Sequence, residues 1–300
     1  MEIVYRPARA EELPAAQELV VQSINDLTAR HGFGPMASVR PADFQLFSLR
    51  DDPEGLWVAE AAGEIVGFTF AWASDGFWFL AELFVSPKHQ GRGIGDALLQ
   101  RTFAHADRAG ARNKALITFT FNTVSQGLYI RNGLYPRLPI YFFKATRDSI
   151  MEHRRGEVLR HTSMEGTNQD LAQLAQFDTA AIGFARDKHH RFLRGDGQMR
   201  GVFLHAGEDC IGYAYIHSGG HIGPLAVKRP EVMSAAFATA LELAAESGAA
   251  DISAFLPGLC HAALDVAVAH GMRITFPMVL VSAREFGDFG RYLPRNPGFM

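Results

Sequence analysis

Apolar and polar residues along the chain predict strands and helices in one order, which occurs twice. Apolar side chains at every second position predict strands, and apolar side chains three or four positions apart predict helices. The elements expected in the first half are strand 3–6, helix 11–28, helix 41–49, strands 56–60, 65–73 and 78–85, helix 91–109, strand 116–120, helix 123–132 and strand 135–145.

A similar order returns after residue 157. Adding 138 to Gly133 gives Gly271, and both glycines follow a helix; adding 142 to Val85 gives Val227, and both valines end a strand. The elements expected in the second half are strand 158–164, helix 168–182, strands 199–205, 211–217 and 222–227, helix 232–247, strand 252–256, helix 259–269 and strand 273–282.

This order predicts an α/β fold with mixed sheets, because each strand–helix–strand crossover makes one parallel strand pair. The stretch at residues 147–157 is polar and charged, as domain boundaries commonly are. We therefore expect a first domain at residues 1–146, a linker at 147–157 and a second domain at 158–300.

Composition and charge exclude several classes of protein. The 300 residues are 48% hydrophobic and 20% charged with a net charge of -3, which is typical of a globular protein and argues against nucleic acid as a partner. No apolar run of ~18 residues suggests a membrane span, and the N-terminus lacks a signal-peptide pattern. Two cysteines form no disulfide framework, so we expect a cytoplasmic protein. The twelve histidines lack ligand spacing, so no metal site is expected.

The most informative segment is a glycine-rich loop between a strand and a helix. Gly91, Gly93 and Gly95 follow the strand that ends at Val85 and open the next helix. Glycine permits positive φ angles and lets a ligand approach the backbone. The first amide groups of a helix have no partner within it, and they attract phosphate. The loop therefore predicts a phosphate or pyrophosphate site.

Two other phosphate-binding loops fit this segment less well. The dinucleotide fingerprint requires G-x-G-x-x-G with an acidic residue about 20 positions further on, and the mononucleotide loop requires G-x-x-x-x-G-K-[ST]. The pattern [QR]-x-x-G-x-[GA], in contrast, is matched in full from Gln90 to Gly95, and Leu83 to Pro87 match the strand that leads to it. The segment thus resembles the GNAT superfamily of N-acetyltransferases.

The resemblance implies two tandem GNAT-like domains and acetyl-CoA as the acyl donor. In this family the loop amides hold the pyrophosphate of acetyl-CoA, and the preceding strand pairs with its pantetheine arm. The residues that the resemblance assigns to the pyrophosphate are Gln90, Gly91, Arg92, Gly93, Ile94, Gly95 and Asp96, and those it assigns to the pantetheine arm are Leu83, Phe84 and Val85.

A second family pattern, N-x-x-A-x-x-L-Y-x-x-x-G, matches from Asn122 to Gly133, with Ser125 in place of the alanine. The resemblance makes Asn122 a contact for the cofactor arm and Tyr129 the general acid that protonates the leaving thiolate. A tyrosine has a pKa of about 10, so it carries its proton at neutral pH. The alternative is that Tyr129 is one more aromatic residue of the core.

An ammonium acceptor must also lose a proton before it attacks a thioester. Glu82 stands in an apolar run between Ala81 and Leu83, where partial desolvation would raise its pKa toward neutrality. We expect Glu82 to be the general base. Members of the family differ in this residue, and some relay the proton through water, which is the alternative.

Two aromatic segments allow more than one interpretation. The aromatic residues between positions 57 and 79 are expected to lie mainly in the core, with the wall of an apolar acceptor pocket as the alternative. The second, residues 292–300, is rich in proline, so we expect it to be extended and docked on a surface. The residues of the first segment are Trp57, Trp72, Phe77, Trp78 and Phe79.

The second half lacks the residues of the predicted site. Residues 228–233 contain no glycine, and Pro230 removes an amide donor. A looser resemblance, carried by residues 178–183, Arg186 and residues 223–225, is to the degenerate C-terminal GNAT-like domain of some bacterial tandem acetyltransferases. We therefore expect no acetyl-CoA to be processed there. The residues at equivalent positions are Pro224 for Glu82, Cys260 for Asn122 and Ala267 for Tyr129.

The leading interpretation is an enzyme that moves an acetyl group from acetyl-CoA to a primary amine of a small molecule or peptide. A protein that binds acyl-CoA as a sensor, without catalysis, is the alternative from another class. Tandem proteins that acetylate a thiol-sugar precursor fit less well, because their second domain is the active one. The acceptor, the length of the acyl group and the oligomeric state stay open, and no nucleic-acid or membrane partner is expected.

Overall fold

The computed structural model describes residues 2–154 and 158–300, which form two compact units. Unit 1 comprises Met1–Ile117, Phe121–Tyr135 and Ser282–Arg284. Unit 2 comprises Thr118–Thr120, Pro136–Val281 and Glu285–Met300. Each unit therefore contains short pieces from the other half of the sequence.

Unit 1 is built on a mixed sheet. The first four strands are antiparallel neighbours, and β4 and β5 form a parallel pair across the crossover helix α3. The strands in spatial order are β1 (Val4–Pro7), β2 (Leu56–Ala61), β3 (Glu64–Ser74), β4 (Phe77–Val85) and β5 (Asn113–Phe119).

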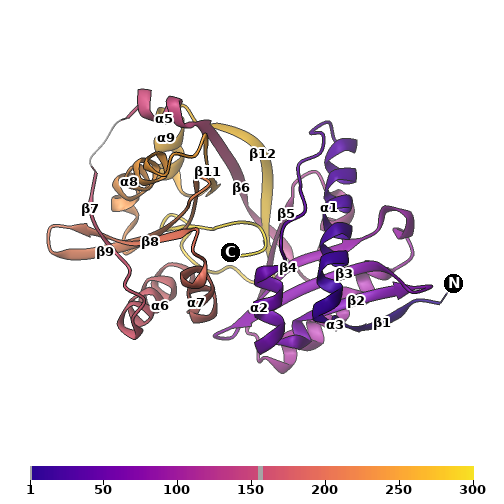
Figure 1. The fold of residues 1–300 in the computed structure, drawn as a ribbon. Coiled ribbons are helices and arrows are strands. Elements are labelled where there is room, and N and C mark those ends of the chain that lie inside the picture. The colour runs from indigo at the N-terminus through magenta and orange to yellow at the C-terminus, as the bar shows by residue number, and fades with distance from the viewer. Residues whose placement is uncertain (1, 155–157) are drawn as a thin grey trace. The chain divides into compact units, whose positions relative to one another are not determined.

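Helices pack on both faces of this sheet, because the side chains of β4 point alternately to either side. Leu83 and Val85 pack against the core cluster to which α3 contributes Ile94 and Leu98, whereas the carboxylate of Glu82 faces α1 and α2. Figure 1 shows α1 and α2 in front of the strands of this unit. The helices are α1 (Leu13–Arg30), α2 (Asp43–Asp51), α3 (Ile94–Arg108) and α4 (Thr123–Arg131), with short 3-10 turns η1 (Ala10–Glu12), η2 (Pro53–Gly55) and η3 (Pro87–His89).

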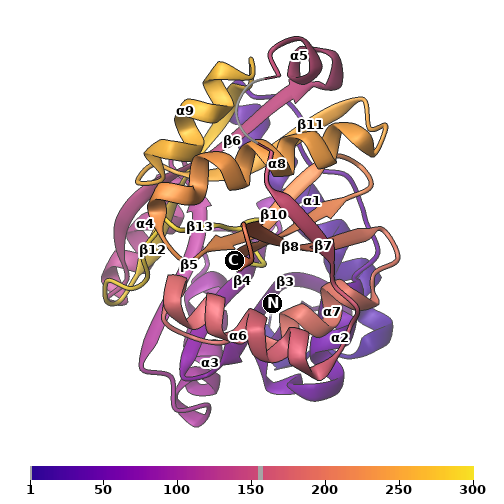
Figure 2. The ribbon, with the colours of Figure 1, turned by 90° about the vertical axis from the view of Figure 1, so that its left-hand side faces the viewer.

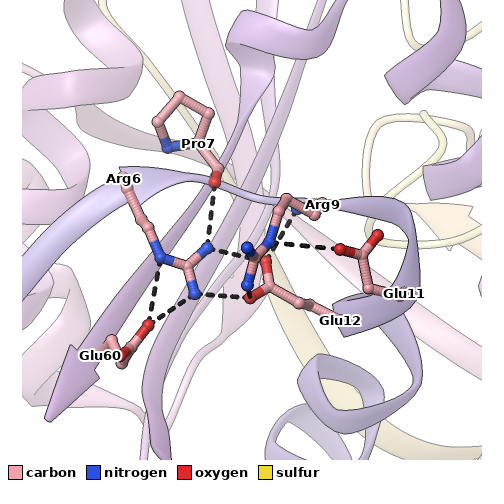
Figure 3. Close-up of polar contacts among 6 residues, drawn as sticks. All are labelled: Arg6, Pro7, Arg9, Glu11, Glu12 and Glu60. Carbon is pink, nitrogen blue, oxygen red and sulfur yellow. Dashed lines mark hydrogen bonds and ion pairs between the residues drawn. The ribbon is translucent and has the colours of Figure 1, made fainter. Parts of the chain in front are cut away.

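An ion-pair cluster fixes the entry of the chain into α1 (Figure 3). Arg6 of β1 reaches both Glu12 of η1, at 2.5 Å, and Glu60 of β2, at 2.6 Å. Hydrogen bonds from Arg6, with further help from Arg9, lower the pKa of Glu12 to about 2 despite the opposing effect of burial. The cluster ties β1, β2 and the start of α1 together, a structural role on the rim of the sheet.

Unit 2 has a sheet of the same kind. Strands β7 to β10 are antiparallel neighbours, β10 and β11 are parallel, and β6 is antiparallel to β11. Two further strands are β12 (Arg273–Ser282), next to β6, and β13 (Tyr292–Leu293), on β10. The others are β6 (Tyr135–Thr146), β11 (Asp251–Pro257), β10 (His221–Val227), β9 (Asp209–His217), β8 (Met199–Ala206) and β7 (Arg160–Ser163).

The helices of unit 2 again lie on two sides of the strands. Figure 2 shows α8 and α9 on one side of β8 and β10, and α6 and α7 on the other. The apolar side of α8 is buried along its whole length, as expected for a helix that covers a sheet. The helices are α5 (Arg147–Glu152), α6 (Asn168–Ile182), α7 (Asp187–Gly195), α8 (Met233–Glu246) and α9 (His261–Ala269), with the 3-10 turn η4 (Pro230–Val232).

The compact units divide the chain differently from the sequence-based boundaries. Strand β6 was expected to close the first domain, yet residues 140–146 pair with β11 and belong to unit 2. Residues 147–152 of the expected linker form α5 with Ile150 buried, and residues 155–157 of that linker lie outside the described residues. The strand pattern of β6 indicates an extended segment but not its partner, and the limits 1–146 and 158–300 stay a prediction about the two copies.

Candidate acyl-CoA site

The centre of the candidate site is the place where β4 and β5 diverge. Residues 77–80 of β4 pair with β5, whereas the pairing of β4 with β3 continues to Val85. An irregularity at Ala81 adds one residue to β4 at the point of divergence. Within the described chain, the edge of residues 82–85 that leaves β5 is thus open to another hydrogen-bonding partner. Leu83, Phe84 and Val85, predicted to contact the pantetheine arm, lie on this edge.

The glycine loop lies directly after this edge. Gly91 and Gly93 have φ angles of 76° and 77°, which residues other than glycine rarely adopt. A Cβ added at either position would meet no atom within 4 Å. Gly93 is the N-cap of α3, and it has no side chain that could cap the first amides of the helix. The side chain of Gln90 donates to the carbonyl oxygen of Val85 at 3.1 Å and so fastens the loop to β4.

The amides of the loop are available to an anion. Among the hydrogen bonds of the described residues, none takes the backbone N–H of residues 91–96. Ile94 is buried and anchors the start of α3, while Arg92 and Asp96 are exposed. An array of unpaired N–H groups at a helix start fits a phosphate or pyrophosphate group. The loop therefore has the geometry that the sequence predicted for residues 90–96.

Helix α4 lies beside this loop. An ideal Cβ on Gly95 would lie 3.9 Å from Cδ2 of Leu128 and 3.8 Å from Cγ2 of Val85. Asn132, at the end of α4, donates to Asp96 at 3.3 Å and accepts from Gln100 at 2.7 Å. The end of β4, the loop and α4 therefore come together, as the two family patterns require.

The two residues expected from α4 differ in their surroundings. Asn122 is the N-cap of α4, and its Oδ1 accepts from the amide of Ser125 at 3.2 Å, which leaves its Nδ2 for a ligand. Tyr129 is 5% exposed, and burial raises its pKa above 10. Its hydroxyl makes no hydrogen bond among the described residues. The raised pKa keeps the hydroxyl protonated at neutral pH, so it can donate a hydrogen bond to a bound ligand.

Glu82 sits at the point of divergence with two amide partners. The Nε2 of Gln45 in α2 lies 3.0 Å from its Oε1, and the Nε2 of Gln17 in α1 lies 3.5 Å from its Oε2. Burial raises the pKa of Glu82 to about 7, although both amides lower it. A pKa near neutrality lets the ionised carboxylate take a proton from an ammonium ion and release it again, as a general base must.

Sequence reasoning missed Gln17 and Gln45. They lie 65 and 37 positions from Glu82, and a glutamine on the face of a predicted helix gives no sign of its partner. Of the aromatic residues considered for an acceptor pocket, Trp72, Phe77, Trp78 and Phe79 are at most 3% exposed. They are core residues, as expected, and Trp57 is half-buried.

Unit 2 has the same backbone elements without the same groups. Cys260 is the N-cap of α9 and Ala267 is buried in that helix, where unit 1 has Asn122 and Tyr129. Turn η4 carries Pro230 at its start in place of the glycine loop. Among the described residues no cluster of three His, Cys, Asp or Glu side chains is placed to hold a metal. No helix of the described residues is long and apolar enough to cross a membrane.

Comparison with known proteins identifies the class. Residues 22–134 match the model of the acetyltransferase (GNAT) family and form a GNAT acetyltransferase domain, and enzymes of this family transfer the acyl group of an acyl-CoA. No curated protein matches the sequence.

Solved structures show that the likeness extends over the whole chain. A protein assigned as an acetyltransferase from Pyrococcus horikoshii has a TM-score of 0.77 at 17% identity, covering 99% of this chain and 96% of that one. A GCN5-related N-acetyltransferase from Sphaerobacter thermophilus has a TM-score of 0.65 at 16% identity, with 96% and 98% covered. A tandem GNAT protein from the clavulanic acid pathway has 0.61 at 15%, with 94% and 98% covered. The fold is therefore that of two tandem GNAT-like domains.

Proposed function

We propose that the protein is an N-acetyltransferase that uses unit 1 to transfer an acetyl group from acetyl-CoA to a primary amine. The observation that carries the proposal is the coincidence, at one end of β4, of an open strand edge, the unpaired amides of residues 91–96 and the carboxylate of Glu82. A sheet that served only a structural role would require none of the three.

Each group has one task in the reaction. Acetyl-CoA supplies the thioester carbonyl that the amine attacks. The amides of residues 91–96 bind its diphosphate, and the edge at Leu83 to Val85 holds its arm through backbone hydrogen bonds. Glu82 accepts a proton from the acceptor ammonium, which exposes the lone pair of the nitrogen. Tyr129 donates its hydroxyl proton to the sulfur as the carbon–sulfur bond breaks, and the second proton that the acceptor nitrogen loses on becoming an amide restores this hydroxyl.

The test measures release of free CoA from acetyl-CoA with a panel of amines, comparing the wild type with Glu82→Gln. Since Glu82 acts in its ionised form, kcat/KM of the wild type should fall as the pH drops through about 7. The variant should lose about 10²-fold in kcat/KM at pH 7.5 and should lack this pH dependence.

Glu64→Gln is the matched control, because Glu64 is an exposed carboxylate at the start of β3 in the same sheet. It should behave like the wild type. Binding of CoA without turnover of any amine would contradict the enzyme and support the sensor. An unchanged pH profile in Glu82→Gln would remove Glu82 as the base.

A further inference from the structure

Unit 2 contains a second divergence of parallel strands. Strand β10 pairs with β11 at His221 and Ile222 and then leaves it. The last residue pair before the strands part is Leu80 with Leu116 in unit 1 and Ile222 with Ala254 in unit 2. Ile222 lies 142 positions after Leu80, and Ala254 lies 138 positions after Leu116, the same two spacings as in the sequence repeat. Each diverging strand also has an irregularity directly after this pair. The two units thus open at equivalent positions.

The opening in unit 2 is filled by a later part of the chain. Strand β13 pairs with β10 in antiparallel register, Leu293 with Leu225 and Tyr292 with Ala226, and it also lies against β11. The amide of Val227 donates to the carbonyl oxygen of Arg291 at 3.0 Å. Subtracting 142 shows that these positions of β10 correspond to Leu83, Phe84 and Val85. In unit 2 a peptide strand therefore occupies the edge that unit 1 leaves open.

Close approach of the backbone shows that β10 is shaped for this strand. Gly223 has a φ of 134°, and a Cβ there would lie 2.7 Å from the carbonyl oxygen of Pro294. The Nε2 of His221 lies 2.5 Å from the carbonyl oxygen of Arg295. The sequence predicted that residues 292–300 dock on a surface. Tyr292 and Leu293 are instead fully buried, so this part of the segment lies in the interior of unit 2.

The buried ion pair of Arg186 and Asp178 contacts the C-terminal segment at Met300 and at Tyr292. Arg186 donates from Nε to Oδ2 of Asp178 at 2.9 Å and from Nη1 to the carbonyl oxygen of Met300. Its guanidinium carbon lies 5.1 Å from the centre of the Tyr292 ring. Burial alone would raise the pKa of Asp178, but the charges of Arg186 and His190 lower it, so the pair stays ionised. The charge that anchors the segment is therefore present at all ordinary pH values.

We propose that residues 291–293 are an internal ligand of unit 2, which occupies the edge of β10 that corresponds to the proposed acyl-CoA arm site of unit 1. A strand in the same chain is always present at high effective concentration, and its backbone satisfies the edge of β10. Unit 2 is then a permanently filled copy, and the chain binds one acyl-CoA. The inference rests on the proposed function only for the comparison with unit 1.

The first experiment measures CoA binding to the full chain by calorimetry together with hydrogen exchange of backbone amides. The expected result is one equivalent of CoA, slower exchange at residues 83–96, and no change at residues 225–227, which exchange slowly with or without CoA. Two equivalents, or a change at residues 225–227 on addition of CoA, would overturn the proposal.

The second experiment compares Leu293→Pro with Leu293→Ala, since both remove the side chain but only proline removes the amide that faces β10. Leu293→Pro should speed the exchange of Val227 at least about tenfold over Leu293→Ala and leave CoA affinity unchanged. Equal exchange in the two variants would refute the backbone pairing. If Leu293→Pro does not fold, the wild-type stoichiometry still tests the proposal. If no CoA binds at all, the proposed function fails, while slow exchange at Val227 that depends on Leu293 still supports the internal strand.

Discussion

The two strand divergences differ in what completes them. In unit 1 the edge of residues 82–85 is open and runs into a loop of unpaired amides; in unit 2 the equivalent edge pairs with β13 and runs into a turn that starts with Pro230. Exposed strand edges invite unwanted pairing, and β13 removes such an edge from unit 2. The comparison teaches that one backbone geometry serves a ligand site or a closed core, depending on the groups beside it.

Glu82 of unit 1, which is partly buried, and Asp178 of unit 2, which is fully buried, show the same contrast. Glu82 has only two neutral amides as partners, so burial raises its pKa to about 7. Asp178 forms two hydrogen bonds with a buried guanidinium, so its pKa is lowered although burial opposes this. A carboxylate with a pKa near neutrality can exchange protons there, whereas one paired with a guanidinium stays ionised. This contrast supports the proposal that unit 1 carries the chemistry.

The largest expected effect comes from removing the hydroxyl of Tyr129. Tyr129→Phe should lower kcat by about 10²–10⁴-fold, because the thiolate would leave without a proton donor, while the KM for acetyl-CoA stays within a factor of about 3. Tyr135→Phe is the control, since Tyr135 is 49% exposed and lies six positions further on. Full turnover by Tyr129→Phe would make this tyrosine a core residue and weaken the contrast with Ala267 in unit 2.

A smaller effect is expected from the glycine loop. Gly93→Ala places a side chain at a φ of 77° and shifts the amides that face the diphosphate, so the KM for acetyl-CoA should rise about tenfold. Gly110→Ala is a close control, because Gly110 also has a positive φ, 65°, with open space around it, but lies at the far end of α3. Both variants should lose about 1 kcal/mol of stability, and only the first should lose affinity. Equal effects on KM would argue against a phosphate site.

The smallest effect concerns the partners of Glu82. Gln45→Leu removes the nearer amide donor, so the pKa of Glu82 should rise above about 7 and the acidic limb of the pH–rate profile should move to higher pH by up to about one unit. Gln17→Leu should give a smaller shift in the same direction, because its contact of 3.5 Å is longer. A fall in rate at every pH without a shift would show that Gln45 only supports the packing of α2.

The sequence predicted most elements of the fold but not their partners. The strands and helices of the first half were expected within a few residues, because their hydrophobic periodicity is local. Helix α7 was not expected: its apolar residues are few, and His189 and His190 are buried by tertiary contacts rather than by hydrophobicity. The pairing of β6 with β11 of unit 2 was also not expected, because it joins residues more than 100 positions apart in the sequence.

What the sequence alone determined is the local machinery of unit 1. The spacing of Gly91, Gly93 and Gly95 after a strand implies positive φ angles and unpaired amides at a helix start, and those properties belong to the backbone of a few consecutive residues. The loss of these glycines in the second half was equally visible. Such features depend on neighbours in the chain, so they can be inferred without a fold.

Only the tertiary structure determined which groups meet across the sequence. It brought Gln17 and Gln45 to Glu82, and it placed Tyr292 and Leu293 along β10 where unit 1 offers an open edge. These contacts form because burying apolar surface and pairing backbone groups lower the free energy of the folded chain, whichever distant segment supplies the partner. No local pattern contains that choice, so the pairing of one strand edge and the exposure of the other are properties of the folded chain.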